Sequence, residues 1–346
     1  MSATELERLA DVLRRNGLAG VPEEPFPNDG WSGATLSLLR RGDGDRFVLK
    51  RVSLARDWIA QATNDGPVLR EAWFAAHGPT LPSPIRAPYL GAGVDGDEFG
   101  ILMPDLTGVL FDWEAPISVE DLDRILGGLA EFHGYPWSVP GVLESGPWCP
   151  IPERLTLICR ATLERPGAAR DAVGERILPG WDAFDRRAPS ESRELVHSLG
   201  EDPRPLVDAL ATMPSTLIHG DLKLANVGIE PGGTIDLVDW QMVTLAPVAV
   251  ELGWFLVSNV ASLPFPPDDV LTRYHAATVN QGVAGEPTVA AWQAQTDAAI
   301  LVGLLLRGWR KGADAEAVLT LASGVSAADD LAWWCDRALE AAERIL

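Results

Sequence analysis

Cysteine is scarce in this sequence, which limits the folds and the chemistry that the chain can support. The three cysteines, Cys149, Cys159 and Cys335, lie far apart, and no Cys-x-x-Cys pair occurs. We therefore expect neither a disulfide framework nor a cysteine-based zinc site. The scarcity fits a reducing compartment, so the sequence predicts a cytoplasmic protein.

Basic residues are also few, and the chain is strongly acidic. There are 28 lysines and arginines against 49 aspartates and glutamates, and the formal net charge is −21 at pH 7. Such a surface repels nucleic acid and anionic membranes, so neither is expected as a partner. It also attracts cationic small molecules over long distances, although solubility alone is a sufficient reason for the charge.

Long apolar runs are missing as well. No run approaches the ~20 residues that a membrane-spanning helix needs, so no membrane partner is expected. Residues 3–16 form a charged amphipathic pattern, which predicts a helix rather than a signal peptide. Hydrophobic residues make up 47% of the 346 residues, enough to exclude a disordered chain. A chain of this length usually exceeds one core, so two lobes or domains are expected.

The familiar nucleotide-binding glycine motifs are absent or misplaced. The sequence contains no Gly-x-x-x-x-Gly-Lys-Ser/Thr segment, which excludes a P-loop nucleoside triphosphatase. Residues 91–96 match Gly-x-Gly-x-x-Gly, but that pattern binds a dinucleotide only where a strand turns into a helix. Residues 97–103 read as a strand instead, so the glycines predict a hairpin turn.

The sequence does contain a short segment with three oxygen-bearing side chains. Asp221 and Asn226 lie five positions apart in a loop, and Asp239 ends the next apolar run. Residues 226–229 and 234–238 predict the two strands of a hairpin, with Pro-Gly-Gly in its turn. Asn226 opens this hairpin and Asp239 closes it, so both lie at the same end. A carboxylate that accepts a proton, beside two oxygen ligands for Mg²⁺, is typical of phosphoryl transfer.

This segment resembles the aminoglycoside phosphotransferase and choline kinase family, through His-Gly-Asp, an asparagine five residues after the Asp, and a hydrophobic-Asp-Trp triplet. The resemblance implies that Asp221 is the catalytic base and that Asn226 and Asp239 bind Mg²⁺. It also implies that His219 braces the catalytic loop and that Lys223 contacts the γ-phosphate. Taken singly, an Asp in a loop is more often a turn residue, and Lys223 can equally be a solvated surface lysine.

The resemblance extends over roughly residues 20–310 and implies the α+β, two-lobed fold of protein kinases. It assigns residues 1–103 to a small lobe built on an antiparallel sheet, 104–108 to a hinge and 109–346 to a mainly helical large lobe. In this family the hinge backbone binds adenine, and Met103 would flank the ring, although a methionine is more often part of a core. The implied cofactors are ATP or GTP and Mg²⁺.

The small lobe is predicted to hold a buried lysine. Residues 35–52 read as two strands joined by a turn, and Lys50 lies among apolar residues of the second strand. A buried ammonium group needs a partner. By resemblance, Lys50 grips the α- and β-phosphates and pairs with an acid on the next helix, which is predicted over residues 65–77. We choose Glu71 as that acid rather than Glu98, although a solvated helix face explains Glu71 nearly as well.

The loop before these strands has the small residues that a phosphate-binding turn requires. Gly30, Ser32 and Gly33 would let backbone N–H groups approach an anion. We therefore expect Ser32 and Gly33 to contact the nucleotide, although the spacing departs from the glycine loop of protein kinases.

Apolar periodicity predicts a series of helices in the large lobe. The expected ranges are 119–134, 152–163, 190–211, 248–260, 267–280, 288–310 and 325–345. His133, at the end of the first, is expected to be structural. Glu251 stands where members of the family carry an Asp that braces the catalytic loop, and we expect Glu251 to have the same role.

The acceptor is expected to be a hydroxyl group of a small molecule, and its identity stays open. An aminoglycoside, an amino sugar, a choline-like amino alcohol and a neutral sugar are all compatible with the motif. Aromatic residues near acids, at 111–114, 181–185 and 333–336, are candidates for the acceptor pocket. A monomer and a homodimer are both open. The alternatives are a nucleotide-binding pseudokinase that acts as a regulator and a binding protein for a cationic ligand. The chain keeps the base, both metal ligands and the lysine, which favours an active kinase.

Overall fold

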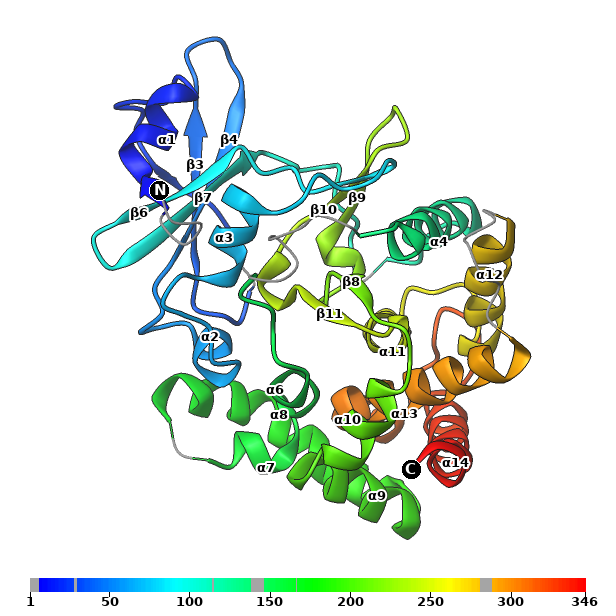
Figure 1. Cartoon of the computed structure of the whole chain (residues 1–346). Helices are drawn as coiled ribbons and strands as arrows, with labels where there is room; N and C mark the ends of the chain where they lie inside the picture. The colour runs from blue at the N-terminus through cyan, green and yellow to red at the C-terminus, as the bar shows by residue number, and fades with distance from the viewer. Residues whose placement is uncertain (1–5, 28–29, 114, 138–145, 166, 281–287) are drawn as a thin grey trace.

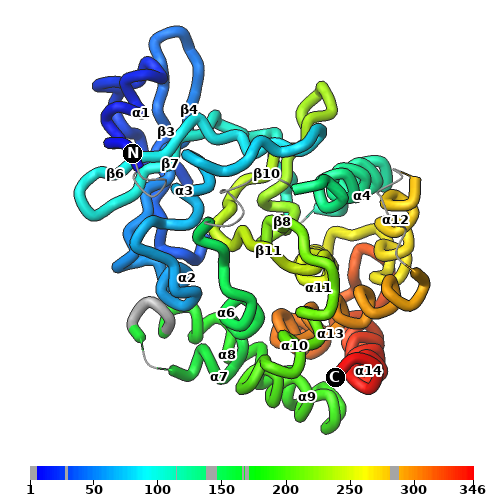
Figure 2. Tube along the Cα trace, in the orientation of Figure 1, coloured from blue at the N-terminus to red at the C-terminus, as the bar shows by residue number. Residues whose placement is uncertain are grey.

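The chain folds into an N-terminal β-sheet and a larger, mainly helical region (Figure 1). This computed structural model describes residues 6–27, 30–113, 115–137, 146–165, 167–280 and 288–346. The predicted α+β class is confirmed. Helix α1 (Leu9–Arg15) and helix α14 (Ala327–Ile345) lie at opposite ends of the molecule (Figure 2).

The N-terminal sheet has six strands in the order β1-β6-β7-β4-β3-β2. Only β1 runs parallel to its neighbour, and the other pairs are antiparallel. The strands are β1 (Glu7–Arg8), β2 (Glu24–Pro25), β3 (Thr35–Arg40), β4 (Arg46–Val52), β6 (Gly91–Asp95) and β7 (Glu98–Pro104). The two strands predicted between residues 35 and 52 are confirmed as β3 and β4.

The alternation of side chains along β4 decides where Lys50 lies. Phe47 and Leu49 belong to the cluster that α1 covers, whereas Val48 and Val52 belong to the cluster on the other face. Because successive side chains point to opposite faces of a strand, Lys50 shares the face of Val48 and Val52. That face packs against helix α3 (Arg70–His77).

Two predicted helices of the N-terminal region are shorter than expected. The helix predicted over residues 65–77 begins only at Arg70, because Pro67 disfavours helical backbone at the residue before it. The Asp65 carboxylate instead accepts hydrogen bonds from the Arg70 N–H at 2.9 and 3.1 Å. The N-terminal helix is α1, and the residues just before it form β1; the expected residues 3–5 lie outside the described part. A further short helix, α2 (Trp58–Ala62), was not predicted.

The glycine pattern at residues 91–96 forms a hairpin, as predicted. Gly91 and Gly93 lie within β6 itself, and the turn to β7 follows at Gly96, whose φ is 66°. Gly93 is needed for packing, since a Cβ there would lie 2.7 Å from the Leu9 backbone nitrogen. The glycine pattern therefore forms part of the β6–β7 hairpin rather than a dinucleotide-binding turn.

Short strands link the two regions. Strand β10 (Ile235–Leu237) pairs with β9 (Val227–Ile229) in the predicted hairpin and, on its other edge, with β5 (Ile85–Arg86). Strands β8 (Thr216–Ile218) and β11 (Thr244–Ala246) form a second small ribbon. The chain thus reaches the hairpin at residues 85–86 before it returns to the six-stranded sheet.

Helices make up most of the remaining chain. They are α4 (Val119–Gly134), α6 (Ile151–Thr156), α7 (Arg160–Leu163), α8 (Ala168–Arg187), α9 (Ser190–Glu201), α10 (Arg204–Ala211), α11 (Val248–Ser258), α12 (Pro267–Asn280), α13 (Val289–Glu316) and α14. The helix predicted over residues 152–163 is divided into α6 and α7, and that over 190–211 is divided before Pro203. Helix α8 was missed because it contains Pro179, which usually ends a helix.

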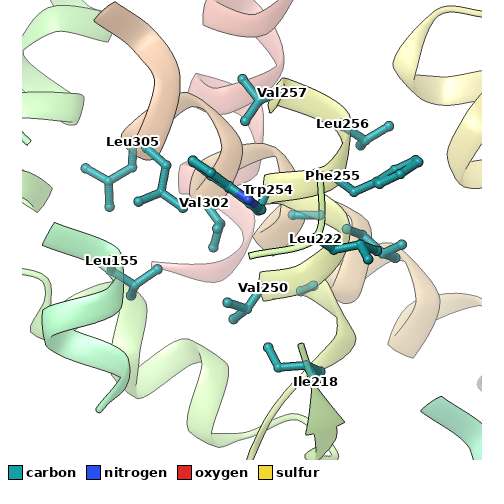
Figure 3. Packing of buried hydrophobic residues seen from close by; sticks show 14 of the residues in the cluster. Leu155, Ile218, Leu222, Val250, Trp254, Phe255, Leu256, Val257, Val302 and Leu305 are labelled. Carbon is teal, nitrogen blue, oxygen red and sulfur yellow. The ribbon is translucent and has the colours of Figure 1, made fainter. Parts of the chain in front are cut away.

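Helix α13 forms the centre of the large core. It packs against α8, α11 and α14, and Figure 3 shows Val302 and Leu305 of α13 beside Trp254 of α11. The approach of α11 is close, because a Cβ on Gly253 would lie 2.4 Å from the Ala299 carbonyl oxygen. Leu155 and Leu222 extend the same cluster toward the predicted catalytic loop.

The composition of α13 departs from the expectation of no long apolar run. Among the described helices it is the one whose length and composition would allow it to cross a membrane, with an 18-residue window of mean hydropathy 1.4. However, 67% of that window is buried inside the protein. The core helix of a globular protein has the same composition.

Candidate active site

The loop between β8 and β9 is held at its start by one buried carboxylate. Glu251 of α11 accepts hydrogen bonds from the His219 N–H at 2.7 Å and the Gly220 N–H at 2.9 Å. Gly220 has a φ of 80°, and a Cβ there would lie 2.1 Å from the Met242 carbonyl oxygen, so only glycine fits. The bracing role predicted for Glu251 is confirmed as a contact.

His133 holds Glu251 in turn. Its Nε2 lies 3.6 Å from the Glu251 carboxylate, and its Nδ1 lies 2.9 Å from the Tyr274 hydroxyl. Burial acts to raise the pKa of Glu251, but His133 and the backbone N–H of His219 outweigh it and hold that pKa below its ordinary value. The carboxylate therefore stays charged, and His133 is structural, as expected.

We predict that Glu251→Gln destabilises the protein and slows catalysis together. An amide of the same size would turn its NH₂ toward one of the two backbone N–H donors, which would lose its acceptor at a cost of about 2–3 kcal/mol. Glu251→Asp keeps both acceptors and should retain most of the stability. Urea denaturation and turnover of both variants test this, and equal stability of Glu251→Gln and wild type would contradict it.

Two other side chains fix the rest of the loop. The Leu224 N–H donates to Asn259 Oδ1 at 2.8 Å, just after α11. Arg154 of α6 donates from Nε to the Gly220 carbonyl oxygen at 2.8 Å and is almost fully buried. Sequence analysis missed both, because neither belongs to a local motif.

Asp221, Lys223 and Asn226 meet within this loop. Asn226 Nδ2 donates to the Asp221 carbonyl oxygen at 2.9 Å and to its carboxylate Oδ2 at 3.3 Å. Lys223 Nζ lies 3.0 Å from the same carboxylate oxygen. The Asp221 carboxylate is thus oriented by an amide and neutralised by an ammonium group. The lysine is an ion-pair partner here rather than an isolated surface residue.

His219 joins the loop to the end of the hairpin. Its Nδ1 accepts the Asp221 N–H at 3.2 Å, and its Nε2 lies 2.9 Å from the Val238 carbonyl oxygen. These partners require the proton to be on Nε2, which makes the ring a neutral spacer. The ring is fully buried and lies 4.5 Å from the Trp240 ring. Its geometry matches the predicted brace and leaves no nitrogen for proton transfer.

Lys50 connects the sheet to the hairpin. Its Nζ lies 2.6 Å from Glu71 Oε2 and 2.6 Å from Asp239 Oδ1. Burial would lower the pKa of Lys50, but the two carboxylates raise it well above its ordinary value. Burial raises the pKa of Glu71, whereas for Asp239 the attraction of Lys50 and Lys223 outweighs burial and lowers the pKa. The predicted Lys50–Glu71 ion pair is confirmed, while Glu98 pairs with Arg51 and Arg56.

Tyr89 is a central residue that sequence analysis missed. Its hydroxyl donates to Glu71 Oε1 at 2.8 Å and accepts the N–H groups of Asp239 at 3.1 Å and Trp240 at 3.3 Å. Asp239 has left-handed backbone, with φ 68° and ψ 57°, which a non-glycine residue rarely adopts. Tyr89 therefore fixes both the acid that pairs with Lys50 and the unusual turn that presents Asp239.

We predict that Tyr89→Phe weakens nucleotide binding more than acceptor binding. The ring would stay, but one acceptor and two donors would lose their partner, at a cost of about 1–3 kcal/mol. The KM for the Mg-nucleotide should rise, with the KM for the acceptor little changed. Tyr135→Phe, at an exposed tyrosine, is the matched control. A uniform loss of stability without any change in nucleotide KM would count against positioning by Tyr89.

The other residues predicted to bind nucleotide are Ser32, Gly33 and Met103. Ser32 is buried and accepts the Ala34 N–H at 3.5 Å, and a Cβ on Gly33 would lie 2.8 Å from the Arg56 carbonyl oxygen. Among the described contacts, neither residue forms a hydrogen bond with Lys50 or Asp239. Met103 of β7 packs in the cluster on the Lys50 face, which Val238 also joins. Their contact with a nucleotide stays a prediction.

The aromatic clusters proposed for the acceptor pocket have diverse environments. Trp181 and Trp334 are fully buried in the large core, whereas Trp113 is 46% exposed. Glu114 lies outside the described residues. Burial of two indoles inside the core leaves no ring face for a ligand, so these two tryptophans are packing residues.

Asn226 and Asp239 fit a divalent metal site. The Val238 N–H donates to the Asn226 carbonyl oxygen at 3.0 Å, so the two residues lie at the same end of the hairpin, as predicted. The Asn226 amide nitrogen is used by Asp221, and Asp239 Oδ1 by Lys50, which leaves one hard oxygen on each side chain for a metal. Mg²⁺ accepts two such ligands when water and phosphate complete its shell.

Comparison with known proteins gives a family match and a fold match. The model of the phosphotransferase enzyme family matches residues 25–292. A choline kinase from Cryptosporidium parvum Iowa II is 11% identical, with a TM-score of 0.51 over 97% of this chain and 96% of that one. An aminoglycoside phosphotransferase from Alicyclobacillus acidocaldarius is 16% identical, with a TM-score of 0.41 over 98% and 92% of the two chains. No curated protein matches the sequence.

Proposed function

Because the chain belongs to the phosphotransferase enzyme family, we propose that it is a small-molecule kinase that transfers the γ-phosphoryl group of ATP or GTP to a hydroxyl group. The observation that carries the proposal is the pair of carboxylates, Asp239 and Asp221, at the open end of the β9–β10 hairpin. Asp239 is held by a lysine from the sheet at 2.6 Å, and Asp221 is held by Asn226 at 3.3 Å. Asp239 thus lies beside the lysine that would bind the nucleotide phosphates, whereas Asp221 is available to act on a hydroxyl group.

The proposed chemistry assigns one task to each group. Asp221 accepts the proton of the acceptor hydroxyl while the hydroxyl oxygen forms a bond to the γ-phosphorus. The bond between the γ-phosphorus and the nucleoside diphosphate breaks at the same time. Asn226 and Asp239 would hold Mg²⁺, which neutralises charge on the phosphate oxygens. Lys50 would meet the α- and β-phosphates. The protein forms no covalent bond to the substrates in this scheme, so positioning and charge neutralisation supply most of the rate enhancement.

Nucleotide binding and turnover, measured separately, test the proposal. Mg-ATP or Mg-GTP at 100 times its Kd should stabilise the protein by about 2.7 kcal/mol in thermal unfolding, and EDTA should remove the effect. Nucleotide consumption is then followed with amino sugars, aminoglycosides, amino alcohols, neutral sugars and hydroxy acids. Absence of stabilisation by either nucleotide would reject the kinase assignment. Stabilisation without transfer to any acceptor would instead indicate a pseudokinase.

A further inference from the structure

Two arginines near Asp221 lack the acidic partners that buried cations need. Arg154 of α6 is 1% exposed and Arg307 of α13 is half-buried, and in the described part of the chain neither forms an ion pair. Their neighbour Lys311 shows the usual arrangement, with Nζ 2.6 Å from Asp330. Since a buried, unpaired charge is costly, an anion from outside the chain is the natural partner for the two guanidinium groups.

The same region collects hydrogen-bond donors without acceptors. Arg154 Nη2, Arg307 Nε and the indole nitrogens of Trp254 and Trp309 are all buried and have no partner within the described structure. The Arg154 guanidinium lies 4.6 Å from the Trp254 ring centre, and that of Arg307 lies 5.6 Å from Trp254 and 5.0 Å from Trp309. The four donors therefore form one cluster. Unsatisfied buried polar groups are rare, and a cluster made only of donors points to a ligand that supplies only acceptors.

The cluster adjoins the catalytic loop. Arg154 binds the carbonyl oxygen of Gly220, the residue before Asp221. Burial lowers the pKa of Arg154, and the charge of Asp221 is the largest influence that opposes it. Burial and the charge of Arg310 lower the pKa of Arg307 to about 10, and the charges of Asp314 and then Asp221 oppose the shift. Both guanidinium groups therefore lie within electrostatic reach of the proposed base.

The backbone of α13 is interrupted at Arg307. Its φ of −130° and ψ of 16° are not helical, although the helix continues on both sides. Helix α13 is therefore kinked at the residue that carries one of the two guanidinium groups. Figure 3 shows that this stretch of α13, at Val302 and Leu305, lies beside Trp254.

We propose that this cluster, defined by Arg154, Trp254, Arg307 and Trp309, binds an anionic group on the phosphoryl acceptor, so that the substrate is a hydroxy acid or a phosphorylated alcohol rather than a cationic aminoglycoside. The inference rests on the proposed kinase function. Guanidinium groups match the paired oxygens of a carboxylate or phosphate, and indole N–H groups add neutral donors. The local positive charge repels an ammonium group at short range, whatever the net charge of the whole surface.

Direct binding is the first test, because it needs no turnover. Inorganic phosphate and glycerate are titrated into the protein while tryptophan fluorescence is recorded. Saturable binding is expected, and Arg307→Gln should weaken it at least 10-fold. Arg186→Gln, which makes the same charge change in an exposed arginine of α8, should leave it unchanged. No saturable binding of either anion would overturn the proposal, and so would equal weakening in both variants.

Matched acceptors give the second test. Glycerate is compared with glycerol, glucuronate and glucose 6-phosphate with glucose, and glucosamine is included as the cationic member. The anionic member of a pair should have at least a 10-fold higher kcat/KM, and Arg307→Gln should remove that preference by raising the KM for the acceptor. Preference for glucosamine or for the neutral members would overturn the inference while leaving the kinase assignment intact. Failure to bind Mg-nucleotide would reject the kinase assignment instead.

A third comparison separates the acceptor from the nucleotide as the source of the anion. Trp309→Phe removes one N–H donor, keeps an aromatic ring and serves as a second variant should Arg307→Gln fold poorly. Both variants should leave the KM for Mg-ATP and the slow hydrolysis of ATP without acceptor within about twofold of wild type. If these change and the acceptor KM does not, the cluster binds the transferred phosphate and the acceptor assignment is wrong.

Discussion

Asp221→Asn should lower the turnover number by about 10²- to 10⁴-fold, or about 3–5 kcal/mol of activation free energy, without changing the fold. The amide keeps the size of the carboxylate but cannot take a proton from the acceptor hydroxyl. It also loses the ion pair with Lys223, whose Nζ lies 3.0 Å away. The affinity for Mg-nucleotide should change little, because that site depends on Asp239 and Lys50. Steady-state kinetics and calorimetric titration with Mg-ATP measure the two quantities separately.

The matched control is Asp202→Asn. The Asp202 side chain is 44% exposed and, within the described residues, forms its ion pair with Arg204 alone, so its change should leave turnover at the wild-type value. A folded Asp221→Asn variant with wild-type turnover would remove Asp221 as the base. The kinase assignment would then need another proton acceptor, and the buried, neutral His219 does not offer one.

The geometry of the proposed catalytic segment was predictable because it depends on residues that are close in the sequence. A hairpin fixes its two ends next to each other, so the positions of Asn226 and Asp239 follow from the turn between them. Alternation of side chains along a strand likewise predicts which face of the sheet carries Lys50. The helix that follows the strand then limits the candidates for the acidic partner of Lys50 and favours Glu71. In each case the spacing along the chain determines the spacing in space.

Tyr89 and the arginine cluster were not predictable for the opposite reason. Tyr89 contacts residues 18 and 150 positions away, and Arg154 is separated by 153 positions from Arg307. In the sequence these look like an aromatic residue in a loop and two cations on helices. Only tertiary packing shows that the Tyr89 hydroxyl reaches Glu71 and Asp239. It also shows that the two arginines lie in one cluster and, within the described residues, form no ion pair with an acid.

Errors in the helix boundaries have a similar origin. The helix predicted from Asp65 starts at Arg70 because Pro67 interrupts it, and the Asp65 side chain instead accepts the Arg70 N–H. Helix α8 keeps Pro179 because Gly180 then lets it approach α13, where a Cβ would lie 2.7 Å from the Trp309 carbonyl oxygen. Packing between helices thus outweighs the local preference of single residues.

Lys50→Met should lower the free energy of unfolding by about 3–5 kcal/mol and weaken Mg-nucleotide binding. Lys50 is the cation between two carboxylates, each 2.6 Å from its Nζ. Removing it leaves Glu71 and Asp239 facing each other in a poorly solvated site. The double variant Lys50→Met/Glu71→Gln removes one of the two charges and should recover much of the stability, but not the nucleotide affinity, which needs the ammonium group.

The pH dependence of this deficit distinguishes charge from packing. In the native protein, burial raises the pKa of Glu71 above its usual 4.5, and Lys50 opposes that shift. Without Lys50 the pKa rises further, so the folded variant binds a proton more tightly than the unfolded chain does. Stability from that proton is fully present below pH 4.5 and is lost as the pH rises through the folded pKa. The deficit of Lys50→Met relative to wild type should therefore grow between about pH 5 and 8. In the double variant, the amide that replaces the Glu71 carboxylate cannot titrate, so the increase of the stability deficit with pH should largely disappear. A deficit of Lys50→Met that is independent of pH in urea denaturation would show that Lys50 stabilises the fold through packing alone.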